Sequence, residues 1–176
     1  MKQLIWAFLP LTLFSCNGQS SNSSKLITAD NIRQTAMKMS ESLIKRDAEV
    51  FIEFHYPKII EMFGSKQKAI IATANGWKKD DEDSIKLIKN TIGNPSKVIR
   101  YKGELQCTIP QTFEYRTPNA IAIIKSTLIA ISQDNGQKWY FIDVAGDNVK
   151  KIKLIFPNLS GDLLIPDQIA PEIIKD

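Results

Sequence analysis

The sequence predicts an α+β domain in which N-terminal helices pack on an antiparallel sheet of four to five strands. Apolar residues recur every three or four positions between residues 28 and 77, which is the helical period, and every second position beyond residue 84, which is the strand period. Turn residues separate the apolar stretches of the second half, and no helical stretch lies between them. Parallel strands need such a crossover, so the strands are expected to pair antiparallel.

The first helix is expected over residues 29–46, with Thr28 or Asp30 as its cap. Its buried face carries four apolar residues at spacings of four, three and four: Ile32, Ala36, Met39 and Leu43. A second apolar segment covers residues 50–56 and meets Pro57, whose ring interrupts or kinks a helix.

Residues 57–63 are expected to form a further short turn, which Gly64 ends. Ser65 then caps a helix that continues through Trp77. This helix is expected to end in the run of charged residues at 78–83.

Five strands are expected over residues 84–92, 96–102, 104–116, 119–133 and 137–144. The strongest local signal is Asn135-Gly136 between two apolar stretches, because both residue types tolerate the positive φ that a tight hairpin needs. Beyond the sheet, residues 149–156 are expected to form a short helix. The tail that follows contains three prolines and is expected to be extended.

Length and charge indicate one domain without nucleic-acid or metal chemistry. The chain has 176 residues and a formal net charge of +4, from 23 basic and 19 acidic side chains. Residues 25–176 suit a single domain with its own core. Acids and bases are interspersed, which is typical of a solvated surface and argues against a nucleic-acid partner. One histidine, and no cluster of cysteine, histidine and carboxylate residues at ligand spacing, predict no metal and no other cofactor.

The first residues resemble the signal peptide of a bacterial lipoprotein. Lys2 precedes an apolar run from Leu4 to Phe14, which is too short to span a bilayer. The run ends in Leu13-Phe14-Ser15-Cys16, which is similar to a lipobox, although Phe14 departs from the usual small or aliphatic residue. The resemblance implies a signal peptide over residues 1–15, lipid on Cys16 and a polar tether over residues 16–24. The domain would then be anchored to a membrane of the bacterial cell envelope, at its outer-membrane, periplasmic or surface face.

Two alternatives to the lipoprotein interpretation stay open. One is an ordinary secretory peptide with a coincidental cysteine at position 16, and the other is an uncleaved anchor. Lipid labelling of the cysteine distinguishes both from the lipoprotein.

The order of elements resembles the nuclear-transport-factor-2-like (NTF2-like) superfamily, a cone in which a curved sheet wraps a long first helix. The resemblance lies in the helix at 29–46, the Asp47-x-x-x-Phe51 step after it and the late hairpin that ends at 139–143. Residues 25–156 also resemble an uncharacterised group of exported bacterial proteins, from which no activity carries over. Some NTF2-like proteins are enzymes, such as ketosteroid isomerases and dehydratases, so the resemblance by itself implies a fold and not a function.

Residues 132–139 match the Asp-box of sialidases and other propeller proteins, Ser-x-Asp-x-Gly-x-x-Trp. The motif occurs once, in a chain too short for a propeller, so it is expected to stabilise a hairpin. Ser132 and Asp134 are expected to bind turn amides, Gly136 to supply positive φ, and Trp139 to pack over the turn. Glycan binding through this hairpin is an alternative that requires an exposed Trp139.

His55 is the candidate catalytic residue of the enzyme hypothesis. The resemblance implies a small isomerase, dehydratase or hydrolase in which His55 is the general base and Asp47, Glu53 or Asp143 orients it. The competing interpretation is that His55, at a helix end beside Tyr56, is a capping or packing residue.

The leading hypothesis is a non-enzymatic domain that binds a small apolar ligand or an envelope protein. It depends on the lipobox, the cone-like order of elements and the absence of a catalytic constellation. Aromatic residues could line a pocket between helices and sheet, although most are expected to be core; the candidates are Phe54, Tyr56, Trp77 and Tyr115. Cys107 alternates with apolar residues and is expected to be a small buried hydrophobe on a strand. Whether the chain forms a homodimer through its sheet stays open.

Overall fold

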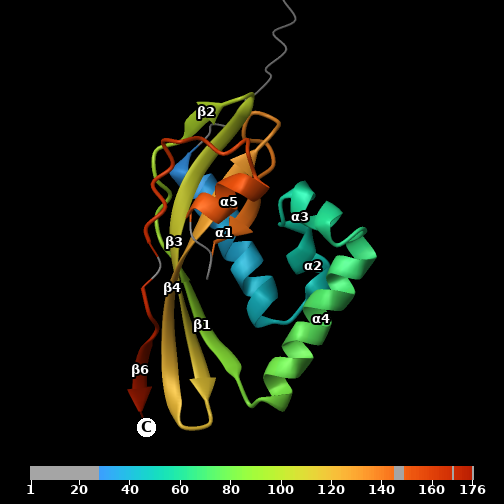
Figure 1. The fold of residues 1–176 in the computed structure, drawn as a ribbon, viewed down its shortest axis with the longest axis vertical. Helices are drawn as coiled ribbons and strands as arrows, with labels where there is room; N and C mark the ends of the chain where they lie inside the picture. The colour runs from blue at the N-terminus through green and yellow to red at the C-terminus, as the bar shows by residue number, and fades with distance from the viewer. Residues whose placement is uncertain (1–27, 145–148, 168, 176) are drawn as a thin grey trace, which may run out of the picture.

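The computed structural model of this chain describes residues 28–144, 149–167 and 169–175. The predicted signal peptide, the tether and Cys16 therefore lie outside the described residues. Within them the chain forms five helices and six strands (Figure 1).

Four helices precede the first strand: α1 (Ala29–Ile44), α2 (Ala48–Glu53), α3 (Pro57–Met62) and α4 (Lys66–Glu82). Thr28 caps α1 by accepting a hydrogen bond from the Asn31 amide at 3.2 Å, and Ser65 caps α4 by accepting one from the Lys68 amide at 3.2 Å. Gly64 separates α3 from α4 with φ of 83°, a conformation that glycine adopts without strain. The predicted caps and breaks of this region are confirmed.

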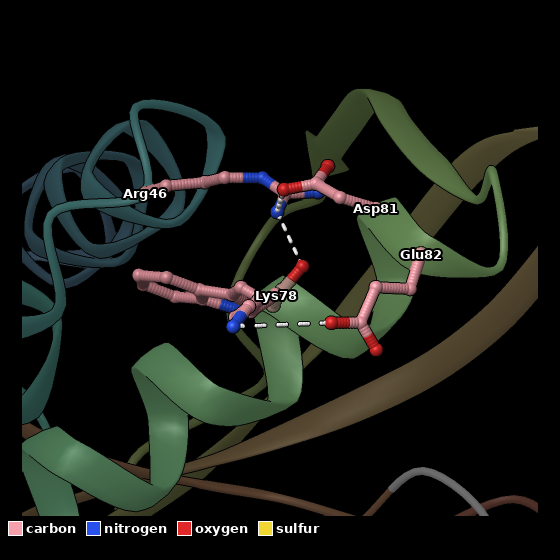
Figure 2. A network of polar contacts seen from close by, with 5 residues as sticks. Arg46, Lys78, Asp81 and Glu82 are labelled. Atoms are coloured by element: carbon pink, nitrogen blue, oxygen red, sulfur yellow. Dashed lines mark hydrogen bonds and ion pairs between the residues drawn. The ribbon is translucent and has the colours of Figure 1, made fainter.

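The helix α4 ends at Glu82, within the charged run at 78–83 where its end was expected. Ion pairs one helical turn apart stabilise this run, with Lys78 and Glu82 at 3.9 Å and Lys79 and Asp83 at 2.7 Å. Arg46, which follows α1, forms hydrogen bonds to the C-terminal part of α4 (Figure 2). Its guanidinium donates to the Trp77 carbonyl at 2.6 Å and to the Asp81 carboxylate at 2.8 Å.

The strands form one antiparallel sheet in the order β1-β3-β4-β5. Their bounds are β1 (Lys86–Ile92), β2 (Ile99–Tyr101), β3 (Glu104–Thr117), β4 (Ala120–Ser132), β5 (Tyr140–Asp143) and β6 (Glu172–Lys175). β2 pairs with β3 beyond the end of β1, and β6 pairs with β4 at residues that β5 does not reach. The predicted antiparallel pairing and the five predicted strands are confirmed.

Two parts of the fold prediction need correction. The sheet has six strands and not four to five, because Glu172–Lys175 in the tail adds to the open edge of β4 as β6. The helices are also not all N-terminal, because α5 (Val149–Ile155) follows β5, and this helix confirms the short helix predicted over residues 149–156. In Figure 1 the tail after α5 runs along the side of the sheet that faces away from α2, α3 and α4.

Both faces of the sheet are covered where β4 pairs with β5, and residues 127–132 of β4 are all buried. One face packs against α1 through a core cluster that includes Ile32, Ala36, Met39, Cys107, Leu128 and Phe141. The other face packs against α5 and the tail through Ile129, Ile131, Ile152, Phe156, Leu159 and Leu163. Successive residues of a strand point to opposite faces, so β4 contributes to both clusters.

Candidate functional site

The backbone around His55 is fixed to the sheet at β5. The Phe141 amide donates to the Phe54 carbonyl at 2.7 Å, and the Tyr56 amide donates to the Phe141 carbonyl at 3.1 Å. These two bonds place the segment between α2 and α3 as a short addition to the sheet edge. The position of the imidazole is therefore set by the hydrophobic core, because Phe141 is buried in it.

One of the two ring nitrogens of His55 has a hydrogen-bond partner. Its Nδ1 lies 3.0 Å from the Phe51 carbonyl oxygen, and a carbonyl can only accept, so Nδ1 carries the proton. The Phe51 ring also packs edge-on against the imidazole at 4.6 Å between centroids. Nε2 then keeps its lone pair, and no side chain of the described residues hydrogen-bonds to it. The sequence predicted a candidate base here, and the structure gives it a defined tautomer.

Burial lowers the pKa of His55 below its usual value, while the hydrogen bond to Phe51 and the negative charge of Asp143 oppose the shift. The imidazole is therefore neutral near pH 7, and Nε2 is an acceptor for a hydrogen bond or a proton. The pKa direction agrees with the geometry, because a buried ring with one free lone pair is poorly placed to hold a charge.

None of the three predicted orienting carboxylates forms a hydrogen bond with the His55 ring in the described chain. Asp47 caps α2 by accepting from the Val50 amide at 3.0 Å, and Glu53 forms an ion pair with Lys66. The Asp143 carboxylate accepts from Gln111 and Ser126. The catalytic arrangement expected for an enzyme is therefore not assembled at His55.

Asp143 lies at the centre of a polar cluster on the helical face of the sheet. Its carboxylate accepts from Gln111 Nε2 at 2.9 Å and from Ser126 Oγ at 2.6 Å. The Oε1 atom of Gln111 and both polar side-chain atoms of Asn90 are buried without a hydrogen-bond partner. Buried polar atoms normally have a partner, so Gln111 in this cluster, and Asn90 on β1, have unused capacity for water or a polar ligand. The alternation of polar and apolar residues did not reveal it.

A groove of about 350 Å³ opens at His55. Its apolar wall consists of Ile52, Pro57, Ile60 and Tyr140, and its charged rim consists of Glu53, Glu61, Lys66 and Lys138. Two of the rim charges neutralise each other in the Glu53–Lys66 pair, and the Lys138 ammonium lies 4.7 Å from the centre of the Tyr140 ring. The groove therefore offers an apolar surface beside the ring of His55.

The four predicted ligand-binding aromatic residues do not meet in one pocket. Phe54 packs against the α1 core cluster, and Trp77 lies 5.7 Å from the Phe51 ring in the helical layer. Tyr115 lies 5.8 Å from Phe113 on β3, where burial and the charges of Asp143 and Asp80 raise its pKa to about 12. Tyr56 belongs to the other cluster, against Phe156 at 6.1 Å. They are spread over two sides of the sheet.

The interpretations of Cys107 and of the late hairpin are confirmed. Cys107 is fully buried, and burial raises the pKa of its thiol to about 12. In the hairpin the Gly136 amide donates to Ser132 Oγ at 2.8 Å, and Asn135 and Gly136 both have positive φ. Trp139 is 3% exposed, so the glycan-binding alternative, which requires an exposed indole, is discarded.

Comparisons with protein-family models, curated proteins and solved structures find no match to this chain. Among the described residues no group of three or more histidine, cysteine or carboxylate side chains could hold a metal ion. In the same part of the chain no helix combines the length and apolar character needed to cross a membrane.

Proposed function

We propose that this chain is a lipid-anchored, non-enzymatic binding domain of the bacterial cell envelope, held to a membrane through Cys16. Its ligand is a small molecule with an apolar body and one hydrogen-bond donor, bound in the His55 groove. The observation that carries the proposal is that His55, whose Nε2 has no hydrogen-bond partner among the described residues, lines this groove together with its apolar wall. An NTF2-like cone is the proposed fold family, supported by the order of the elements and by the packing of α1 on the sheet.

The geometry favours binding over catalysis. Apolar surface supplies affinity for the body of a ligand, and a single placed acceptor fixes its orientation. General base catalysis needs the base to be held by a further group and placed beside a reacting atom. His55 is held by a backbone carbonyl, and no described carboxylate bonds to its ring.

The groove is tested by titrating the full chain with 1-octanol and following methyl and ring resonances by NMR. We expect shifts at Ile52, Ile60 and Tyr140, and loss of binding in Ile60→Lys, which places an ammonium in the apolar wall. The matched control is Ile71→Lys on α4, where the side chain is already 50% exposed and away from the groove. Binding that survives in Ile60→Lys, or shifts confined to other residues, contradicts the proposal.

The anchor is tested separately, by labelling cells with palmitate. The natural chain is expected to incorporate the label and partition with membranes, and Cys16→Ser to lose both properties. Equal labelling of the two chains contradicts the lipoprotein proposal and leaves the groove proposal intact, because each concerns a different part of the chain.

A further inference from the structure

Glu104 is a buried carboxylate at the first position of β3, 6% exposed. Its Oε1 accepts hydrogen bonds from the Tyr56 hydroxyl at 2.8 Å and from Gln133 Nε2 at 2.8 Å. Its Oε2 accepts from Gln106 Nε2 at 3.1 Å. All three donors are neutral, and no lysine, arginine or histidine of the described residues forms an ion pair with this carboxylate.

Three donors leave part of the hydrogen-bonding capacity of the Glu104 carboxylate unused, and they do not balance its charge. Taking a carboxylate out of water is unfavourable unless a cation accompanies it, since neutral donors recover only part of the lost hydration. The network also serves the fold, because Gln106 donates to the Asn158 carbonyl at 2.8 Å and accepts from the Ser160 amide at 2.9 Å. Gln106 alone makes these contacts to the tail, so they do not explain why an acid occupies position 104.

The carboxylate lines a pocket of about 210 Å³ on the side of the sheet that α5 and the tail cover. Tyr56, Ile131, Phe156 and Leu159 line the same pocket, so its walls are largely apolar and aromatic. The Lys58 ammonium lies at its rim, 5.9 Å from the centre of the Phe156 ring. A cation of the protein itself therefore already lies over one aromatic wall.

We propose that this pocket binds a small organic amine, with its ammonium group at the Glu104 carboxylate and its carbon chain against the Tyr56 and Phe156 rings. A carboxylate within aromatic walls is the chemistry that recognises an ammonium group. The pocket is smaller than the roughly 300–1,000 Å³ of sites for drug-sized molecules, so the ligand has few heavy atoms. Lys58 competes with it at the rim. This pocket and the His55 groove share no lining residue, although His55 and Tyr56 are adjacent in the chain.

The test is an NMR titration of the full chain with n-butylammonium chloride, with n-butanol as the uncharged ligand of the same size and sodium chloride to match ionic strength. We expect the ammonium to shift the Ile131 methyl and Tyr56 ring resonances, and n-butanol to bind at least about tenfold more weakly. Glu104→Gln is expected to weaken ammonium binding at least about tenfold. The matched control is Glu114→Gln, near the other end of β3, which is expected to keep the affinity of the natural chain.

A second variant keeps the proposal testable if Glu104→Gln does not fold. Lys58→Ala removes only a surface cation and is expected to raise the affinity for n-butylammonium about two- to fivefold. Equal affinity for n-butanol and n-butylammonium would overturn the proposal, as would unchanged affinity in both the Glu104 and Lys58 variants. An absence of shifts at Ile131 and Tyr56 at any concentration of the amine also overturns it.

Discussion

Replacing Asp134 tests whether the Asp-box residues of this chain stabilise its late hairpin. One carboxylate oxygen, Oδ1, accepts from Ser132 Oγ at 2.9 Å, from the Gln137 amide at 3.0 Å and from the Lys138 amide at 2.9 Å. The two amide bonds are exposed to water and the Ser132 hydroxyl is buried. Counting a modest contribution for each exposed bond and a larger one for the buried hydroxyl, Asp134→Ala should lower the free energy of unfolding by about 2 kcal/mol. Asp134→Asn keeps an acceptor oxygen and should cost about 1 kcal/mol.

The assay is urea unfolding followed by the fluorescence of the buried Trp139, with Asp167→Ala in the exposed tail as the control. The difference between the natural chain and Asp134→Asn should also depend on pH. Burial alone would raise the pKa of Asp134, but the hydrogen bonds from Lys138, Ser132 and Gln137 outweigh it and hold the pKa below its usual value. The charge therefore stabilises the fold above the usual carboxyl pKa, and this stabilisation is lost as pH falls through the lowered pKa.

We therefore expect the difference between the natural chain and Asp134→Asn to be largest near pH 7 and to shrink toward pH 3. An Asp134→Ala chain that unfolds at the same urea concentration as the Asp167→Ala control would refute the reasoning. So would a difference for Asp134→Asn that is the same at both pH values, because the charge would then have no part in holding the turn.

Three further predictions concern packing and titration. Gly93→Ala should lower the free energy of unfolding by about 1–3 kcal/mol, because its Cβ would lie 2.7 Å from Pro110 Cγ. Gly76→Ala in α4 should raise the free energy of unfolding by about 0.5–1 kcal/mol, because its Cβ meets no atom within 4 Å. Urea unfolding measures both changes. Cys107 should react with a thiol reagent only at the rate of unfolding, since it is fully buried and its pKa is raised to about 12, and fast labelling in native buffer would contradict this. Burial lowers the pKa of His55, so its contribution to the free energy of unfolding is complete above the usual histidine pKa and is lost as pH falls through the lowered pKa. In His55→Gln, the free energy of unfolding measured by urea should therefore change less between pH 7 and pH 5 than in the natural chain.

The parts of this fold that were predicted correctly are those encoded by neighbouring residues. Thr28 and Ser65 cap their helices because each hydroxyl reaches an amide three residues away. Asn135 and Gly136 form the hairpin turn because their own backbone preferences suffice. The contacts of Arg46, which follows α1, with Trp77 and Asp81 were not predicted, because they join residues more than 30 positions apart.

The candidate site was predictable only in part. The sequence identified His55 as the candidate base. Its tautomer follows from the Phe51 carbonyl four residues earlier, and its surroundings follow from the residues that line the groove with it. The four aromatic candidates were grouped by residue type, and the sheet separates them onto two sides. Glu104 gave no signal, because an acid at the start of a strand after a turn is usually solvated.

The sequence by itself determined the helical and strand periods, the caps and the hairpin turn of this chain, because each depends on contacts within a few residues. The antiparallel pairing was predicted because no helix lies between the strands to allow a parallel crossover. Only the tertiary structure decided that the tail covers the second face of the sheet and adds β6 to it. The same folding brings Tyr56 to Glu104 across 48 residues and Asn158 to Gln106 across 52. Burial is a property of the assembled layers, so the pattern of one strand cannot show which of its polar residues loses its water.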